Sequence, residues 1–188
     1  MRIIAYIDGY NLYHGIKKCG DKKLKWVNLK SLCQSFCKDG KILKGVNYYS
    51  AYAGWLGKKN YERHYAYVQA IASTGVKDFM SNFKKKPVKC KICGEIFSRY
   101  EEKETDVKMA IQIVADAYED KFDCAMLVTG DTDFIPTMKH IKKLGKKIFL
   151  LTPPKTKAMK EMKKISNYWF EIRAERIEHH LLPQNILK

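Results

Sequence analysis

The sequence predicts an α/β protein in which helices cover both faces of a mainly parallel central sheet. Short segments rich in apolar residues alternate along the chain with segments of helical spacing, and this alternation is typical of parallel sheets. The hydrophobic fraction of 46% is normal for a globular core. From the length of 188 residues we expect a single domain over 1–188, with a small insertion at 84–100.

The first half of the chain predicts three strands and two helices. Residues 2–8 are too few for a core helix and alternate too little for a half-exposed strand, so a buried parallel strand fits them. Residues 46–53 are rich in β-forming side chains and predict the second strand. The other expected elements are a helix at 29–36 capped by Asn28, a helix at 61–72 with one apolar face, and a strand at 76–82.

The second half continues the alternation. Residues 105–118 predict the clearest helix, because Met109, Ile113 and Ala117 recur at helical spacing. A helix at 133–144 would hold Pro136 in its first turn, where a missing N–H costs little, and Gly145 would end it. The other expected elements are strands at 125–128, 147–151 and 168–172, and helices at 155–165 and 174–181.

The insertion at 84–100 carries a Cys-x-x-Cys turn inside a lysine-rich segment. Cys90 and Cys93, followed by Gly94, have the spacing of a zinc knuckle, and they would supply half of a Zn²⁺ site. The alternative is a tight hairpin with two reduced thiols. The candidates for the missing ligands are Cys33, Cys37, His64 or a second subunit; Cys33 and Cys37 also suit plain core cysteines.

The charge of the chain favours a polyanionic partner. The formal net charge is +16, and nucleic acid is the commonest partner of such a basic protein. Between Glu101 and Asp133, ten acids oppose three lysines, so this segment carries −7 and leaves +23 for the rest. An acidic centre in a basic surround suits a metal site that faces a phosphate backbone. The alternative is that the lysines only keep the protein soluble.

Two features argue against a membrane or secreted protein. No apolar run is long enough to span a bilayer, and residues 2–7 lead straight into Asp8 and Gly9, unlike a signal peptide. We therefore expect a cytoplasmic protein with no membrane partner. In that compartment the six cysteines would be free thiols or metal ligands.

Lysines and aromatic residues outside the acidic segment suggest contacts with nucleic acid. Ten lysines and one acid, Glu161, lie between Lys139 and Lys164, and lysine binds phosphate as a point charge without reading sequence. The candidates for phosphate contacts are Lys142, Lys143, Lys146, Lys155, Lys160, Lys163 and Lys164. Exposed aromatic rings at Tyr48, Tyr49, Tyr52 or Trp55 would stack on unpaired bases, although such residues also occur in cores.

Five acidic and amide residues fall at the expected ends of strands or starts of helices. Asp8 and Asn11 follow the first strand, Asp106 begins a helix, and Asp131 and Asp133 follow the strand at 125–128. Carboxylates beside apolar strands are costly unless a positive charge lies among them, and a divalent cation with oxygen ligands is the usual solution. In parallel sheets ligands bind off the carboxyl ends of the strands. The pattern therefore predicts a metal site at that edge.

Each acid also has a structural alternative. Asp133 can be a helix N-cap, and Asp106 can compensate a helix dipole in the first turn. Asp8 has little structural reason to end an apolar strand. Thr132 is a candidate cap for the following helix, and Glu104 is a weaker candidate ligand that can also point outward.

Three motifs resemble a known family. They are I-D-G-Y-N-L at 7–12, E-E-K-E-T-D-V-K-M-A at 101–110 and V-T-G-D-T-D-F at 128–134. In this order they resemble the NYN domain of the LabA-like group, a branch of the PIN-like nucleases. The resemblance implies a Rossmann-like three-layer sandwich that binds Mg²⁺ or Mn²⁺ and cuts RNA. Single-stranded RNA is among the expected partners. A homodimer is a further expectation, from the family and from the half zinc site.

The resemblance also assigns roles residue by residue. The matching metal-site and catalytic acids are Asp8, Asp106, Asp131 and Asp133, and Asn11 matches the asparagine that borders the site. A ribonuclease is therefore the first interpretation, and a non-catalytic RNA-binding module of the same fold is the alternative. A haloacid-dehalogenase-like phosphatase ranks low, because Tyr10 stands where that chemistry needs a second aspartate.

Overall fold

The structure contains one seven-stranded sheet with the strand order β4-β3-β2-β1-β5-β6-β7. It is a computed structural model that describes residues 1–102, 104–157, 159–183 and 185–186. The strands are β1 (Arg2–Asp8), β2 (Ile42–Tyr52), β3 (Lys77–Lys89), β4 (Ile96–Glu102), β5 (Cys124–Val128), β6 (Lys147–Thr152) and β7 (Tyr168–Glu171). Only the pair β3–β4 is antiparallel among the strand pairs of the described chain. The expected mainly parallel α/β sheet is therefore confirmed.

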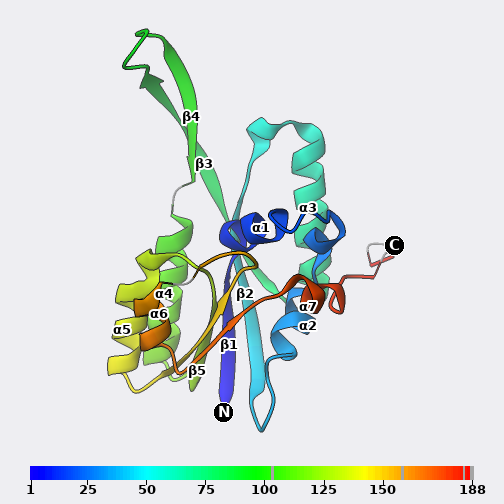
Figure 1. Cartoon of the computed structure of the whole chain (residues 1–188), viewed down its shortest axis with the longest axis vertical. Helices are drawn as coiled ribbons and strands as arrows, with labels where there is room; N and C mark the ends of the chain where they lie inside the picture. Colours follow the sequence, from blue (N-terminus) through cyan, green and yellow to red (C-terminus); the bar gives the residue numbers. More distant parts are fainter. Residues whose placement is uncertain (103, 158, 184, 187–188) are drawn as a thin grey trace.

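Helices cover both faces of this sheet, as Figure 1 shows. One layer holds α1 (Gly9–Lys17), α2 (Leu29–Gln34), α3 (Lys58–Ser73) and α7 (Ala174–Glu178), and the other holds α4 (Thr105–Tyr118), α5 (Ile135–Lys143) and α6 (Lys160–Ile165). Three short 3₁₀ turns, η1 (Lys23–Trp26), η2 (Gly54–Leu56) and η3 (Thr132–Phe134), connect these elements. The result is the expected three-layer sandwich.

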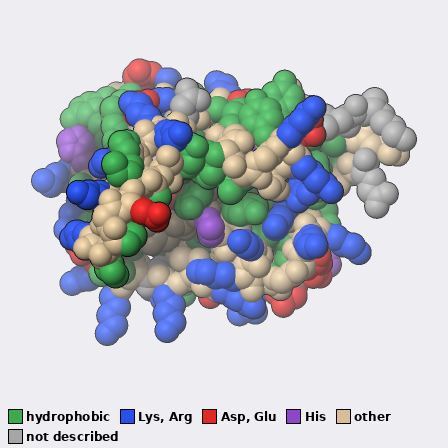
Figure 2. All heavy atoms as spheres, turned by 90° about the horizontal axis from the view of Figure 1, so that it is seen from above, with side chains coloured by type: hydrophobic (Ala, Val, Ile, Leu, Met, Phe, Trp, Pro, Cys, Tyr) green, Lys and Arg blue, Asp and Glu red, His purple; other side chains and the backbone are tan. Residues whose placement is uncertain are grey.

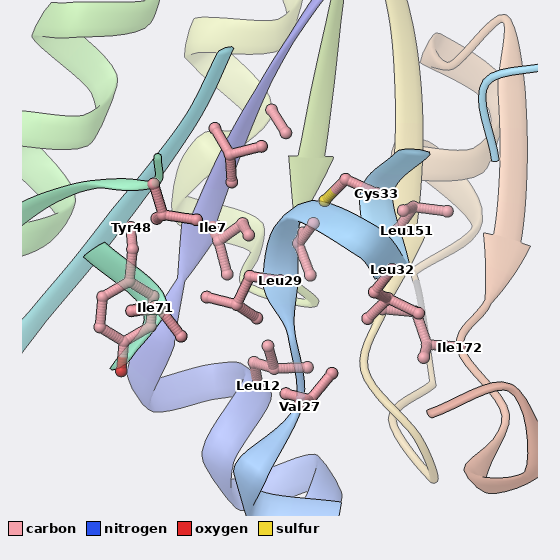
Figure 3. Packing of buried hydrophobic residues seen from close by; sticks show 14 of the residues in the cluster. Ile7, Leu12, Val27, Leu29, Leu32, Cys33, Tyr48, Ile71, Leu151 and Ile172 are labelled. Atoms are coloured by element: carbon pink, nitrogen blue, oxygen red, sulfur yellow. The ribbon is translucent and has the colours of Figure 1, made fainter. Parts of the chain in front are cut away.

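Two separate cores follow from the alternation of side chains along each strand. In β1, Ile3, Ala5 and Ile7 pack into the core under α1, α2, α3 and α7, whereas Tyr6 packs under α4 and α5. Figure 3 shows the first core, where Ile7 and Leu12 meet residues of α2 and β2. Because both faces of β1 are buried, the acid at its end is held in a rigid frame.

Helix α1 was not expected from the sequence, because glycines at its start and in its last turn, Gly9 and Gly15, lower its helix propensity. Both glycines are required by close packing. A Cβ on Gly9 would lie 2.5 Å from the ring of Tyr48, and a Cβ on Gly15 would lie 2.6 Å from Cβ of Pro153. The chain thus passes from β1 directly into α1 at Asp8 and Gly9.

The expected helix at 155–165 begins too early, because the observed helix α6 covers only Lys160–Ile165. Residues Pro153 and Pro154 precede Lys155, whose φ of 53° lies in the left-handed region, and α6 begins only at Lys160. The expected helix at 133–144 also begins later, with η3 before α5, and Gly145 ends it with a φ of 77° as its sequence predicts.

The segment at 84–100 forms most of a β-hairpin that extends the sheet. Residues 83–89 of β3 pair with 96–102 of β4, and the hairpin projects away from the rest of the molecule (Figure 1). At its tip the N–H of Cys90 donates to the carbonyl of Glu95 at 2.7 Å, and the N–H of Gly94 donates to the carbonyl of Cys90 at 3.1 Å. In the described part of the chain, no helix has the length and apolar character needed to cross a bilayer.

Candidate active site

Asp8 ends the central strand β1 and begins α1. Its side chain is 5% exposed, and its Oδ1 accepts a hydrogen bond from the N–H of Asn11 at 2.9 Å. Asp8 is therefore the N-cap of α1. The expectation that it has little structural reason for its position is wrong, because that expectation did not include α1.

Thr129 connects Asp8 to the neighbouring strand. It lies directly after β5 and is fully buried, and its hydroxyl donates to Oδ2 of Asp8 at 3.0 Å. The same Oγ1 accepts from the N–H of Asp131 at 3.0 Å. One buried hydroxyl thus fixes both Asp8 and the backbone that carries Asp131. Sequence reasoning missed Thr129; its place before Gly-Asp in the motif is the signal, since threonine often bonds to backbone two residues on.

Asn11 makes a second link between α1 and the loop after β5. Its Oδ1 accepts from the N–H of Gly130 at 2.9 Å. A Cβ on Gly130 would clash with Cγ2 of Thr156, so a larger residue here would force Thr156, on the loop that follows β6, to move. Asn11 therefore holds the loop after β5 against α1, and the loop after β6 packs on Gly130.

Asp131 and Asp133 lie on the turn that leads into α5. Asp131 is the N-cap of η3, and its Oδ1 accepts from the N–H of Asp133 at 2.9 Å. Asp131 is half-buried and Asp133 is exposed. The expected capping role of Thr132 is thus taken by Asp131, and Asp133 lies in the first turn instead of at the cap.

Asp106 lies in the first turn of α4, and its side chain is exposed. This helix packs against η3, which carries Asp133. Beside it, Thr105 is buried and its hydroxyl has no hydrogen-bond partner among the residues that the structure describes. Glu104 points to lysines: its carboxylate lies 3.3 Å from Nζ of Lys84 and 3.6 Å from Nζ of Lys108. The hydrogen bond from Lys84 and these charges lower the pKa of Glu104.

The structure therefore links Asp8 directly to Asn11, and links Asp8 to Asp131 through Thr129. It places Asp133 and Asp106 on elements that contact each other. Over the described ranges, no three side chains of the types His, Cys, Asp and Glu lie close enough together to hold a metal ion by themselves. The donors at this edge are all oxygens of Asp, Asn and Thr. That donor set fits Mg²⁺ or Mn²⁺, because Mg²⁺ keeps several waters and takes only one or two protein carboxylates.

The cysteines do not form a complete zinc site among the described residues. Cys90 and Cys93 lie at the hairpin tip, where hydrogen bonds from the backbone of Cys93 and Ile92 lower the pKa of Cys90. Cys33 packs in the core of Figure 3, and burial raises its pKa. Cys33 is thus a core residue, and zinc at the tip stays a prediction.

The structure divides the candidate lysines between two ends of the sheet. Lys142, Lys143 and Lys146 lie at the end of α5, next to the start of β6 and away from Asp8. Lys146 is 12% exposed and pairs with Asp120, which also binds Arg2 at the start of β1. These three lysines are therefore remote from the acidic edge.

The other four lysines follow β6, and two of them have defined partners. Nζ of Lys155 donates to the carbonyl of Lys18 at 3.0 Å, and Nζ of Lys163 lies 3.7 Å from the centre of the Trp169 ring. Lys160 and Lys164 are exposed on α6.

A groove lies beside Asp8 on the face covered by α1 and α3. It has a volume of about 510 Å³, and its wall includes Gly9, Tyr48 and Trp55. Tyr48 and Tyr49 are both buried, so they belong to the core and not to an exposed stacking surface. Trp55 is exposed at the rim and stacks on Tyr100, with ring centres 4.5 Å apart. The sequence pattern alone did not predict this groove, because its walls come from distant segments.

The strand order, the two helical layers and the acidic carboxyl edge define a PIN-like α/β domain. The family model described as "NYN domain" matches residues 2–172, so the chain belongs to the NYN domain family. NYN domains are PIN-like domains that are generally nucleases and usually use divalent metal ions. This supports nucleic acid as the class of substrate.

A solved structure shares the fold over nearly the full length. It is a protein of unknown function from Vibrio parahaemolyticus, with a TM-score of 0.64 and 16% sequence identity, and the similarity covers 96% of each chain. At that identity the similarity concerns the fold alone. No curated protein matches the chain.

Proposed function

We propose that this protein is a metal-dependent ribonuclease that hydrolyses RNA phosphodiester bonds at the edge formed by Asp8, Asp131, Asp133 and Asp106. The observation that carries the proposal is the buried hydroxyl of Thr129, which joins Asp8 and Asp131 at the ends of adjacent parallel strands. The three motifs further support a place in the LabA-like group of the family. A cytoplasmic location and a homodimer stay predictions.

The carboxylates are held in fixed orientations for this chemistry. Asp8 accepts hydrogen bonds from Asn11 and Thr129, and Asp131 accepts one from Asp133. A carboxylate has about four acceptor sites, so one side chain can accept hydrogen bonds and also ligate a cation. Asp8 and Asp131 would hold Mg²⁺ or Mn²⁺, which neutralises charge on a phosphate and lowers the pKa of a bound water. Asp133 and Asp106, which are exposed, would orient waters at the rim.

The test is cleavage of end-labelled RNA, and of DNA with the same sequence, in the presence of Mg²⁺, Mn²⁺ or EDTA. We expect RNA cleavage with either metal and none with EDTA. Asp131→Asn should lower the rate by about 100-fold or more, because it removes a ligand charge. Asp39→Asn is the matched control, since Asp39 is an exposed acid on the loop before β2. Wild-type rates in Asp131→Asn, or cleavage in EDTA, would contradict the proposal.

A non-catalytic RNA-binding module is the second candidate, and one observation favours it. Asp8 and Asp131 both act as helix caps, so their presence has a structural explanation. This candidate predicts RNA binding with no cleavage under any metal, and no loss of binding in Asp131→Asn.

A further inference from the structure

The groove beside Asp8 begins where the acidic site ends. Gly9 and Tyr10, the two residues that follow Asp8, are part of its wall. The ring of Tyr48 packs so closely on Gly9 that only glycine fits there. Its volume of about 510 Å³ lies within the range of roughly 300–1,000 Å³ that is typical of small-molecule pockets. The groove and the acidic edge therefore share one piece of backbone.

Aromatic rings at the rim of the groove are accessible and held in place. Tyr10 is 53% exposed, and Trp55 is 37% exposed. The ring of Trp55 lies parallel to that of Tyr100, at an angle of 4°, and its centre lies 4.1 Å from that of the Phe83 ring. The ring of Tyr10 lies 4.3 Å from that of His14. Rings fixed in this way are suitable platforms for nucleic-acid bases.

The charged side chains described in the groove wall are all basic. Lys17, Lys25 and Arg63 are part of its wall, and none of the described wall residues is Asp or Glu. The two histidines of the wall, His14 and His64, have pKa values lowered chiefly by burial. Figure 2 looks down on this end of the molecule and shows hydrophobic side chains and a histidine around a hollow, with Lys and Arg side chains around them. Cations beside rings match the phosphates and bases of a single strand.

We propose that this groove binds bases of single-stranded RNA next to the phosphodiester bond that is cut. The inference rests on the proposed function and names its substrate class. Bases in a duplex are stacked on one another and cannot reach the rings of Tyr10 and Trp55, so the groove selects unpaired RNA. Lys17, Lys25 and Arg63 contact the phosphates without reading sequence.

The test measures binding without cleavage. Fluorescence anisotropy with a labelled single-stranded RNA, and with the same RNA as a duplex, is recorded in EDTA for the full chain. We expect Trp55→Ala and Tyr10→Ala each to weaken single-strand binding by roughly 5- to 100-fold, which follows from the loss of one stacked base, and to leave duplex binding unchanged. Tyr118→Ala is the matched control, because Tyr118 is an exposed tyrosine on α4 outside the groove.

Several outcomes would overturn the inference. They are unchanged single-strand affinity in both groove variants, an equal loss in Tyr118→Ala, an equal loss for the duplex, or free mononucleotide that binds as tightly as the strand. Circular dichroism shows whether each variant keeps the fold. Failure of the nuclease proposal is distinguishable: a protein that never cleaves RNA but loses single-strand binding in Trp55→Ala still has the groove function.

Discussion

Asp8 combines a structural and a chemical role in one side chain. It caps α1 through Asn11, accepts from the buried Thr129, and lies at the edge where the other acids gather. The sequence predicted that Asp8 ends a strand, but it did not predict that Asp8 caps a helix. Gly9 and Gly15 lower the helix propensity of residues 9–17, so α1 was not expected there. The same holds for Thr129, whose two hydrogen bonds depend on the pairing of β1 with β5.

We expect Asp8→Ala to lower the free energy of unfolding by about 1–3 kcal/mol, because it removes a cap and leaves a buried hydroxyl without its acceptor. Asp8→Asn should cost less, since an amide oxygen also caps a helix well. Both variants should lose metal-dependent cleavage. Urea denaturation measures the first effect, and the labelled-RNA assay measures the second. Equal destabilisation by Asn and Ala would contradict the capping argument.

Helix α4 is fixed to the sheet by a buried acid far from the candidate site. Asp116 is 3% exposed and accepts hydrogen bonds from the hydroxyl of Tyr6 at 2.7 Å, from Gln112 at 2.8 Å and from Lys121 at 2.9 Å. Burial and the hydrogen bond to Asp116 raise the pKa of Tyr6. Periodicity predicted α4 with the bounds that the structure shows, but it gave no sign that an acid on its inner face has a tyrosine partner in β1.

Asp116→Ala should lower the free energy of unfolding by about 1–3 kcal/mol, because the buried hydroxyl of Tyr6 loses its acceptor. Tyr6→Phe should cost less, since Asp116 keeps the bonds from Gln112 and Lys121. The two changes together should cost less than their sum, because both remove the same bond. Urea unfolding of the two single variants and the double variant tests this, and additive effects would rule out the link.

At the scale of the whole molecule, the alternation of elements predicted the parallel sheet and its two helical layers, but not the strand order. That order depends on pairing between distant segments, such as β1 with β5. The groove could not be predicted either, because several of the elements that form it, α1, η1, η2 and α3, approach one another only in the folded chain. Counting lysines along the sequence likewise could not separate those near the acidic edge from Lys142 and Lys143 at the opposite end.

The net charge of +16 predicts RNA binding that weakens steeply with salt. The slope of log affinity against log salt should be roughly −0.7 for each phosphate neutralised on a single strand. Replacing Lys17, Lys25 and Arg63 by alanine should therefore reduce the magnitude of the slope by about 2. The matched control replaces Lys142 and Lys143, which should change it little. Affinity that is independent of salt, or equal changes in the two sets, would refute this assignment.

The direct passage from β1 into α1 leaves the chain no freedom of length at this junction. One residue inserted between Asp8 and Gly9 would turn the helix by about 100° relative to the strand. One residue inserted within β1 would exchange its two buried faces. Length variation must therefore be absorbed elsewhere, at the tip of the β3–β4 hairpin or in the loops around η1. The part of the chain that carries the first acid therefore does not tolerate insertion or deletion.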